Sequence, residues 1–151
     1  MKIKPLKCTD NLVFFAVDGV ITSSSIPVFS DSVQAGFPSP AEDHMDMDLN
    51  LNDYLVKNPS ATFCVKAIGE SMKDAGIKSG DIMIVDKSLD PKNRSIVLAV
   101  INGEFTVKRV NMSDNTLYLM PENSSFSPIR ITEEMDFQVW GVVTYIIHKA
   151  A

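Results

Sequence analysis

The sequence predicts a mainly β protein whose short, mostly antiparallel strands follow a flexible N-terminal arm. From Thr62 to the C-terminus, β-type runs alternate with turn residues, as they do in all-β domains. Before them, residues 18–44 are rich in glycine, proline and serine, a composition typical of extended or loosely ordered chain. We therefore divide the chain into an arm, residues 1–44, and a β-rich domain, residues 45–151.

The domain is expected to begin with a short helix over Leu51–Val56, capped by Asn50 or Asn52 and ended at Asn58-Pro59. The strands that follow share β-branched and apolar residues bounded by turn signals. They are predicted over Thr62–Ala67, Ile82–Asp86, Ile96–Ile101, Glu104–Val110, Thr116–Met120, Pro128–Ile131 and Phe137–Ile147. A chain of 151 residues, 45% of them hydrophobic, is long enough for one such domain with its own core.

A hairpin around Asn102-Gly103 is the clearest of these elements, because Asn-Gly between two β-rich runs favours a two-residue type I′ turn. This loop places Lys108 opposite Val97. The rest of that face is uncharged and carries Ala99, Thr106 and Val110. Two interpretations stay open for Lys108: its amine reaches water along an apolar stem, or it is desolvated and held neutral so that it can act as a base.

The net charge of the sequence bears on whether the protein binds DNA directly. The net charge is −5, and the acidic excess is concentrated in residues 36–60. An autonomous DNA-binding protein needs a basic surface to neutralise phosphates. We therefore expect no direct sequence-specific DNA binding, and any connection with DNA is expected to run through a protein partner.

The sequence shows no export or membrane signal. The apolar run Leu12–Val17 is shorter than a signal-peptide core and is flanked by Asp10 and Asp18, and nothing approaches the length of a membrane span. We expect a soluble, cytoplasmic protein without membrane association. Cys8 and Cys64 form no CxxC pair, which favours reduced thiols over a disulfide or a zinc site, so neither a metal nor a cofactor is expected.

A candidate nucleophile lies just beyond the first strand of the domain. The segment Gly69–Met72 places Ser71 at a turn that can expose its hydroxyl group and the nearby backbone N–H groups. Serine is common in turns, so Ser71 is either an ordinary turn residue or the nucleophile of an acyl transfer.

The common serine-enzyme motifs do not fit this segment. Lys73 stands where the esterase elbow G-x-S-x-G requires glycine, and Asp74 stands where the β-lactamase motif S-x-x-K requires lysine. His44 lies in the acidic arm and His148 near the C-terminus, so neither is well placed for a Ser-His-Asp triad. A lysine is therefore the better candidate for the base.

Several blocks of the sequence together resemble the UmuD-type SOS mutagenesis proteins. The match runs from about Pro27 to Ile147, whereas the first 28 residues match poorly. In its catalytic domain the wider family is similar to the LexA and phage repressors. The matching blocks occur in order at Phe29–Pro40, Pro59–Thr62, Gly69–Met72, Gly80-Asp81 and Gly103–Arg109.

The resemblance implies a LexA/UmuD-like fold and a self-cleaving serine endopeptidase with a Ser–Lys dyad. Transferred onto this sequence, it makes Ser71 the nucleophile, Lys108 the general base and Ala35-Gly36 the scissile bond. It also implies an oxyanion hole formed by the backbone N–H groups of Glu70 and Ser71. A small alanine and a glycine suit a narrow approach to a serine.

The resemblance implies a biological role as well. A RecA–single-stranded DNA filament would stimulate cleavage during the SOS response to DNA damage. The product would be a homodimer that serves as accessory subunit of an error-prone, UmuC-like Y-family polymerase in translesion synthesis, with the sliding clamp as a further partner. Two alternatives are a non-cleaving interaction module of the same fold and a repressor-like transcriptional regulator, although residues 1–35 offer no helix-turn-helix.

Overall fold

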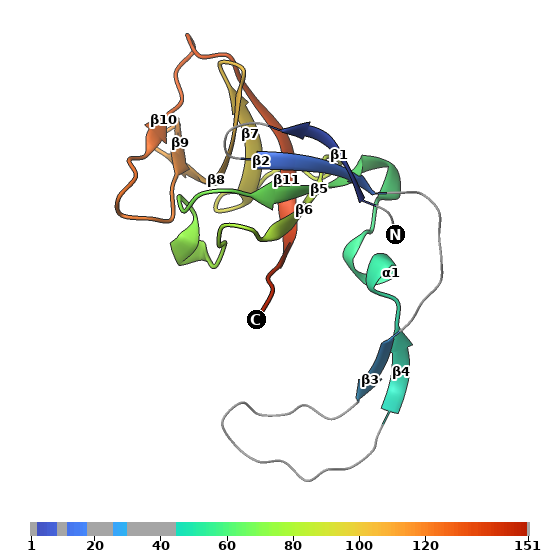
Figure 1. The fold of residues 1–151 in the computed structure, drawn as a ribbon. Helices are drawn as coiled ribbons and strands as arrows, with labels where there is room; N and C mark the ends of the chain where they lie inside the picture. The colour runs from blue at the N-terminus through green and yellow to red at the C-terminus, as the bar shows by residue number, and fades with distance from the viewer. Residues whose placement is uncertain (1–2, 9–11, 18–25, 30–44, 151) are drawn as a thin grey trace.

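The structure is a computed structural model that describes residues 3–8, 12–17, 26–29 and 45–150 (Figure 1). Most of the predicted arm, including Ala35-Gly36, lies outside the described residues. The strands are β1 (Ile3–Cys8), β2 (Leu12–Val17), β3 (Ile26–Phe29), β4 (Met45–Leu49), β5 (Thr62–Ala67), β6 (Ile82–Asp86), β7 (Ile96–Ile101), β8 (Glu104–Ser113), β9 (Thr116–Met120), β10 (Ile129–Arg130) and β11 (Phe137–Ile147). Helical structure is limited to α1 (Leu51–Leu55) and the 3-10 turns η1 (Pro59–Ala61) and η2 (Lys73–Ala75) within the described part.

Nine of the strands form one sheet in the order β1-β2-β5-β6-β11-β7-β8-β9-β10, and every neighbouring pair in it is antiparallel. Strands β3 and β4 form a separate two-stranded ladder, which Figure 1 shows extending away from the main sheet beyond α1. The predicted mainly β, antiparallel fold is confirmed.

The strands from Thr62 onward agree with the predictions except in two strands: β8 continues to Ser113, and β10 covers only Ile129–Arg130. The helix ends at Leu55, one residue early, and Asn50 is its cap because its side chain accepts the N–H groups of the first turn. Strands β1 to β4 were not predicted. The pairings of β2 with β5 and of β3 with β4 join segments that are remote in sequence, which local patterning does not reveal, whereas the pairing of β1 with β2 is local and was missed.

The predicted hairpin has the expected turn. Asn102 and Gly103 have φ angles of 49° and 84°, and a type I′ turn requires positive φ at both positions. The register is also as predicted, with Lys108 opposite Val97 and Thr106 opposite Ala99.

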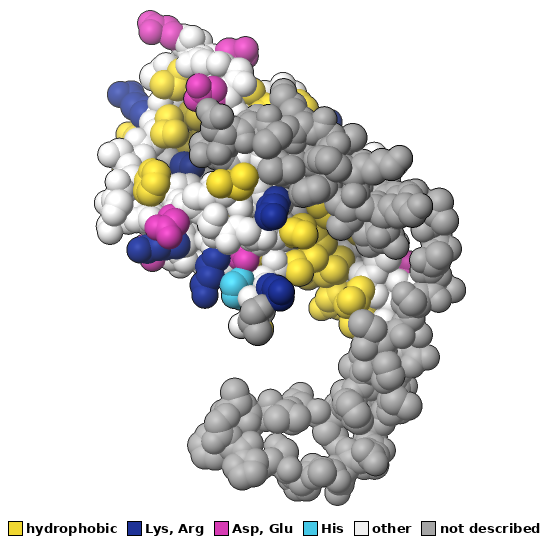
Figure 2. Space-filling view, in the orientation of Figure 1, with side chains coloured by type: hydrophobic (Ala, Val, Ile, Leu, Met, Phe, Trp, Pro, Cys, Tyr) yellow, Lys and Arg dark blue, Asp and Glu magenta, His cyan; other side chains and the backbone are white. Residues whose placement is uncertain are grey.

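The core lies on both sides of the β11-β7-β8 part of the sheet. One cluster is centred on fully buried residues such as Met83 and Leu98, and the ring of Trp140 packs edge-on against Phe105 at its border, with centroids 4.8 Å apart. A second cluster consists of Val97, Ala99, Val110 and Leu119. On the face drawn in Figure 2, acidic and basic side chains are interspersed among the described residues.

Strand β11, between β6 and β7, contains two irregularities. Its register with β7 shifts between Val139 and Gly141, and its register with β6 shifts between Val143 and Tyr145. Extra residues of this kind bend a strand and increase its twist. Gly141 is tightly enclosed at the first shift: a Cβ atom there would lie 2.6 Å from Val85 Cγ1 and 3.0 Å from the Asp86 carbonyl oxygen.

We expect Gly141→Ala to lower the free energy of unfolding by about 1–3 kcal/mol, because the added methyl group overpacks a rigid site. Chemical denaturation of the variant measures this loss. Val85→Ala removes the nearest atom, so the double variant should lose less than the sum of the two single variants. Additive losses, or an unaffected Gly141→Ala variant, would contradict the crowding at this position.

Candidate active site

The turn that follows β5 carries Ser71. Gly69 has a φ of +104°, a conformation that side-chain-bearing residues rarely adopt, and it directs the chain out of the sheet. The base of the turn is held by hydrogen bonds from Gly80 N–H to the Ala67 carbonyl at 2.7 Å and from Ala67 N–H to the Asp81 carbonyl at 2.8 Å. Ser71 itself is half-buried.

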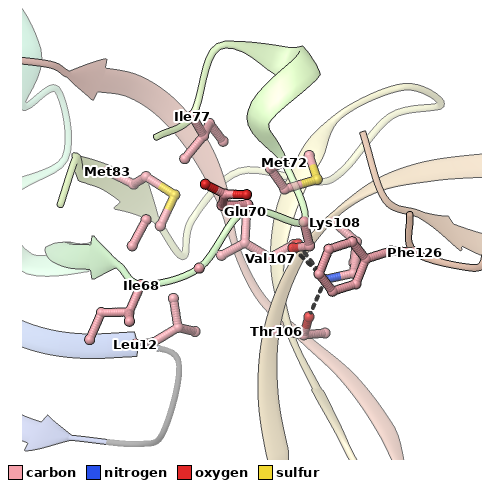
Figure 3. A pocket seen from close by; sticks show the side chains of 13 residues that line it. Leu12, Ile68, Glu70, Met72, Ile77, Met83, Thr106, Val107, Lys108 and Phe126 are labelled. Carbon is pink, nitrogen blue, oxygen red and sulfur yellow. Dashed lines mark hydrogen bonds between the residues drawn. The ribbon is translucent and has the colours of Figure 1, made fainter. Parts of the chain in front are cut away.

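Lys108 on β8 lies against this turn and is only 8% exposed. Its Nζ atom lies 3.1 Å from Ser71 Oγ, 2.7 Å from Thr106 Oγ1 and 3.0 Å from the Val107 carbonyl oxygen. Figure 3 shows the contact between Lys108 and Thr106 beside Phe126. Burial lowers the pKa of Lys108 below the ordinary lysine value. Of the two interpretations of this residue, the one with its amine in water is therefore wrong.

The three oxygens around Nζ can accept all three N–H groups of an ammonium, and they also suit a neutral amine, which has two N–H groups and one lone pair. The Val107 carbonyl can only accept, so it takes one N–H group, and the Thr106 hydroxyl at 2.7 Å takes the other. The lone pair is then left for the hydroxyl proton of Ser71. In this protonation state Lys108 can remove the proton from Ser71 as it becomes a nucleophile.

A pocket of about 150 Å³ opens beside the two side chains. Figure 3 shows Lys108, Thr106 and Phe126 on one side of it and Leu12, Ile68 and Met83 on the other. The wall is mostly apolar and is lined by Leu12, Ala67, Ile68, Gly69, Glu70, Ser71, Met72, Ile77, Met83, Thr106, Val107, Lys108 and Phe126. A small apolar side chain is the kind of group that such a space accommodates.

A loop after β9, residues 121–126, holds the turn from the side opposite β5. The side-chain amide of Asn123 donates to the Glu70 carbonyl at 2.7 Å, and the Asp74 N–H donates to the Glu122 carbonyl at 2.7 Å. The carboxylate of Glu122 pairs with Arg109, the residue after Lys108. Sequence reasoning missed Asn123 and the contact made by Thr106, because an asparagine in a polar loop and a threonine in a strand are both ordinary.

The structure brings together three of the predicted site residues: Ser71, Lys108 and, in the same turn, Glu70. The predicted cleavage site, Ala35-Gly36, lies outside the described residues, and so does His44. His148 does not line the pocket and instead places Nδ1 2.7 Å from Asp81 Oδ1.

Asp81 and Cys64 are the other notable buried titratable groups near this turn. Burial alone would raise the pKa of Asp81, but hydrogen bonds from the Lys78 N–H and from His148 hold it below its ordinary value. Cys64 is a free thiol whose pKa is raised by burial. Within residues 3–8, 12–17, 26–29 and 45–150, no three His, Cys, Asp or Glu side chains gather as a metal site would require.

No helix in the described part of the chain has the length and apolar character needed to cross a membrane. The described helices are confined to α1 and the two 3-10 turns.

Comparison with known proteins identifies the family of this chain. A family model described as Peptidase S24-like matches residues 27–144, which include Ser71 and Lys108 but exclude β1 and β2. The chain is 44% identical to Protein SamA of Salmonella typhimurium strain LT2 over 138 residues, which is 91% of this chain and 96% of SamA. It is 44% identical to Protein ImpA of Shigella flexneri over 124 residues, covering 82% and 83% of the two chains. Protein MucA of Escherichia coli is 41% identical over 132 residues, covering 87% and 90%.

The alignments cover most of this chain and most of each relative, so the similarity concerns nearly whole proteins and not an isolated motif. The resemblance to UmuD-type proteins that the sequence blocks indicated is thereby confirmed, and the chain belongs to the Peptidase S24-like family.

Proposed function

We propose that this protein is a self-cleaving serine endopeptidase that cuts its own Ala35-Gly36 bond with Ser71 and Lys108. The observation that carries the proposal is the 3.1 Å contact between the Lys108 amine, 8% exposed, and the Ser71 hydroxyl. No carboxylate of the described residues pairs with Lys108, and a buried lysine without such a partner is costly for a fold. Its position at a half-buried serine and beside a pocket is explained if the neutral amine is needed as a base.

In the first half of the reaction, Lys108 takes the Ser71 hydroxyl proton while Oγ attacks the carbonyl carbon of Ala35. The negative charge that develops on the carbonyl oxygen is stabilised by the backbone N–H groups of Glu70 and Ser71. Among the residues that the structure describes, neither N–H has a hydrogen-bond acceptor, which supports this role. The Lys108 ammonium then donates its proton to the amine of Gly36, which leaves and yields an ester between Ala35 and Ser71.

In the second half, water hydrolyses the ester. Lys108, neutral again, removes a proton from water as the oxygen attacks the Ala35 carbonyl, and the proton passes to the departing Ser71 oxygen. The products are a fragment ending in the Ala35 carboxylate and a chain beginning with the Gly36 amine. The pocket of about 150 Å³ beside Ser71 suits a side chain as small as that of Ala35.

The resemblance to the UmuD-type proteins supports the proposed biological role. The cleaved protein acts as a homodimer and as accessory subunit of an error-prone, UmuC-like Y-family polymerase in translesion synthesis, with contact to the sliding clamp. A RecA–single-stranded DNA filament stimulates the cleavage during the SOS response, in the cytoplasm. With a net charge of −5, this protein is suited to reach DNA through these partners and not by direct binding.

Ser71→Ala should reduce cleavage by at least about a thousandfold, because the attacking oxygen is lost. Intact-mass spectrometry of purified protein, incubated with and without RecA filament, follows the appearance of a chain that begins at Gly36. Ser60→Ala, at an exposed serine of η1, serves as the matched control and should cleave normally. Undiminished cleavage by Ser71→Ala would show that another group is the nucleophile.

The rate of spontaneous cleavage should rise with pH through the lowered pKa of Lys108 and then level off, since only the neutral amine is a base. Lys108→Arg should be inactive at every pH tested, because a guanidinium stays protonated. Lys73→Arg, an exposed lysine near the nucleophile, should keep the wild-type profile. A pH-independent rate or an active Lys108→Arg variant would exclude Lys108 as the base.

Lys108 should also destabilise the fold near neutral pH. Between the lowered folded pKa and the unfolded value of about 10.4, the unfolded chain binds a proton that the folded chain does not. Stability is therefore lost as pH falls through this interval, and the loss is complete below the folded pKa. In a Ser71→Ala background, which keeps the chain intact, Lys108→Met should raise the free energy of unfolding at pH 7. The gain should shrink as the pH approaches the pKa of lysine in the unfolded chain. Urea titrations at pH 7 and near that pKa measure the gain, and a gain that is absent or independent of pH would contradict the prediction.

A further inference from the structure

Asn123 makes a contact that no catalytic step proposed above uses. It is 7% exposed and is one of few buried polar side chains in the described part of the chain. Its Nδ2 atom donates to the Glu70 carbonyl oxygen at 2.7 Å, and its Oδ1 atom accepts the Ser125 N–H at 3.0 Å. The orientation of the amide is fixed by these partners, since a carbonyl can only accept and a backbone N–H can only donate.

The Glu70 carbonyl shares a planar peptide unit with the Ser71 N–H. The described chain has no cis peptide bonds, so the carbonyl and the N–H of this unit point in opposite directions. A hydrogen bond that holds the Glu70 carbonyl toward Asn123 therefore directs the Ser71 N–H away from Asn123. Glu70 and Ser71 line the pocket and Asn123 does not, although Phe126 at the end of the same loop does, so the N–H is directed away from Asn123 at the edge of the pocket.

The loop that carries Asn123 is itself anchored. The Glu122 carbonyl accepts the Asp74 N–H at 2.7 Å, and the Glu122 carboxylate pairs with Arg109. The Phe126 N–H closes the loop on the Asn123 carbonyl at 3.1 Å. Asn123 thus lies in a loop that is hydrogen-bonded to the turn carrying Ser71 and ion-paired with Arg109 of β8.

A second hydrogen bond to the same carbonyl comes from the Lys73 N–H, at 3.1 Å. This bond spans the turn that contains Ser71, so it moves with the turn. The bond from Asn123 comes from 53 residues away and fixes the peptide unit relative to the rest of the domain. The Ser71 N–H must already be oriented when negative charge develops on the carbonyl oxygen of the cleaved peptide bond, so this fixation matters for the reaction.

We propose that Asn123 is a positioning residue for peptide cleavage: its side-chain amide orients the Glu70–Ser71 peptide unit so that the Ser71 N–H faces the developing oxyanion. This inference rests on the proposed self-cleavage. It assigns to Asn123 an effect on transition-state stabilisation and none on the basicity of Lys108.

Asn123→Ser tests this assignment, because it is neutral and too short to replace the amide donor. We expect the plateau of the cleavage rate against pH to fall by about 10- to 100-fold, less than the 10²–10³-fold typical of losing an oxyanion donor outright. The pH midpoint, which reports Lys108, should stay unchanged. Asn123→Asp, which places a carboxylate against the Glu70 carbonyl, should lower the plateau at least as much.

Ser125→Ala is the matched control, since it alters the same loop but keeps the N–H that orients Asn123. It should cleave at the wild-type rate. Thermal melts show which variants are folded, and rates are compared only among those. A wild-type plateau in folded Asn123→Ser, or a shifted midpoint with an unchanged plateau, would overturn the proposal while leaving the self-cleavage intact. Failure of both Asn123 variants to fold would make the role structural and would also overturn it, whereas absence of cleavage in the wild type would reject the proposed function itself.

Discussion

The contact between Ser71 and Lys108 depends on the curvature of the sheet. Strands β6, β11 and β7 separate β5 from β8, and at a spacing of about 4.8 Å per strand a flat sheet would hold β5 and β8 about 19 Å apart. The turn after β5 covers part of this distance, and bending covers the rest, so that Nζ and Oγ lie 3.1 Å apart. The register shifts of β11 lie between the two halves of the sheet, where added twist brings them together.

Alternate side chains along β8 have different roles, since some pack in the core and the others reach the site. Phe105 and Val107 belong to the larger core cluster, while the residues between and after them, Thr106 and Lys108, reach the site. Thr106 is thus flanked along the chain by two buried apolar side chains, and Lys108 lies between buried Val107 and Arg109, which is held by its ion pair with Glu122. The lysine amine consequently meets its partners on a rigid element, with little conformational freedom to lose before reaction.

The sequence was informative where structure depends on neighbours along the chain. The Asn102-Gly103 turn fixed the register that places Lys108 opposite Val97. The extension of β8 was missed because Asp114 and Asn115, with φ angles of 50° and 60°, form a second tight turn without glycine. The pairing of β2 with β5 and the Asn123–Glu70 contact join distant segments, which no local pattern encodes. The pairing of Ser71 with Lys108 came from family resemblance, since the residues alone left both roles open.

The ladders around the proposed scissile bond have a kinetic consequence. Strand β3 ends at Phe29, opposite Met45 at the start of β4, and β2 pairs with β5, so strands on both sides of residues 35 and 36 are hydrogen-bonded to each other. Hydrolysis would break one covalent bond and none of these ladders. Before hydrolysis the paired strands are held at a high effective concentration by the continuous chain, and afterward the fragment must dissociate on its own. The lifetime of the nicked complex, as well as the rate of hydrolysis, would then determine how quickly the downstream surface becomes free.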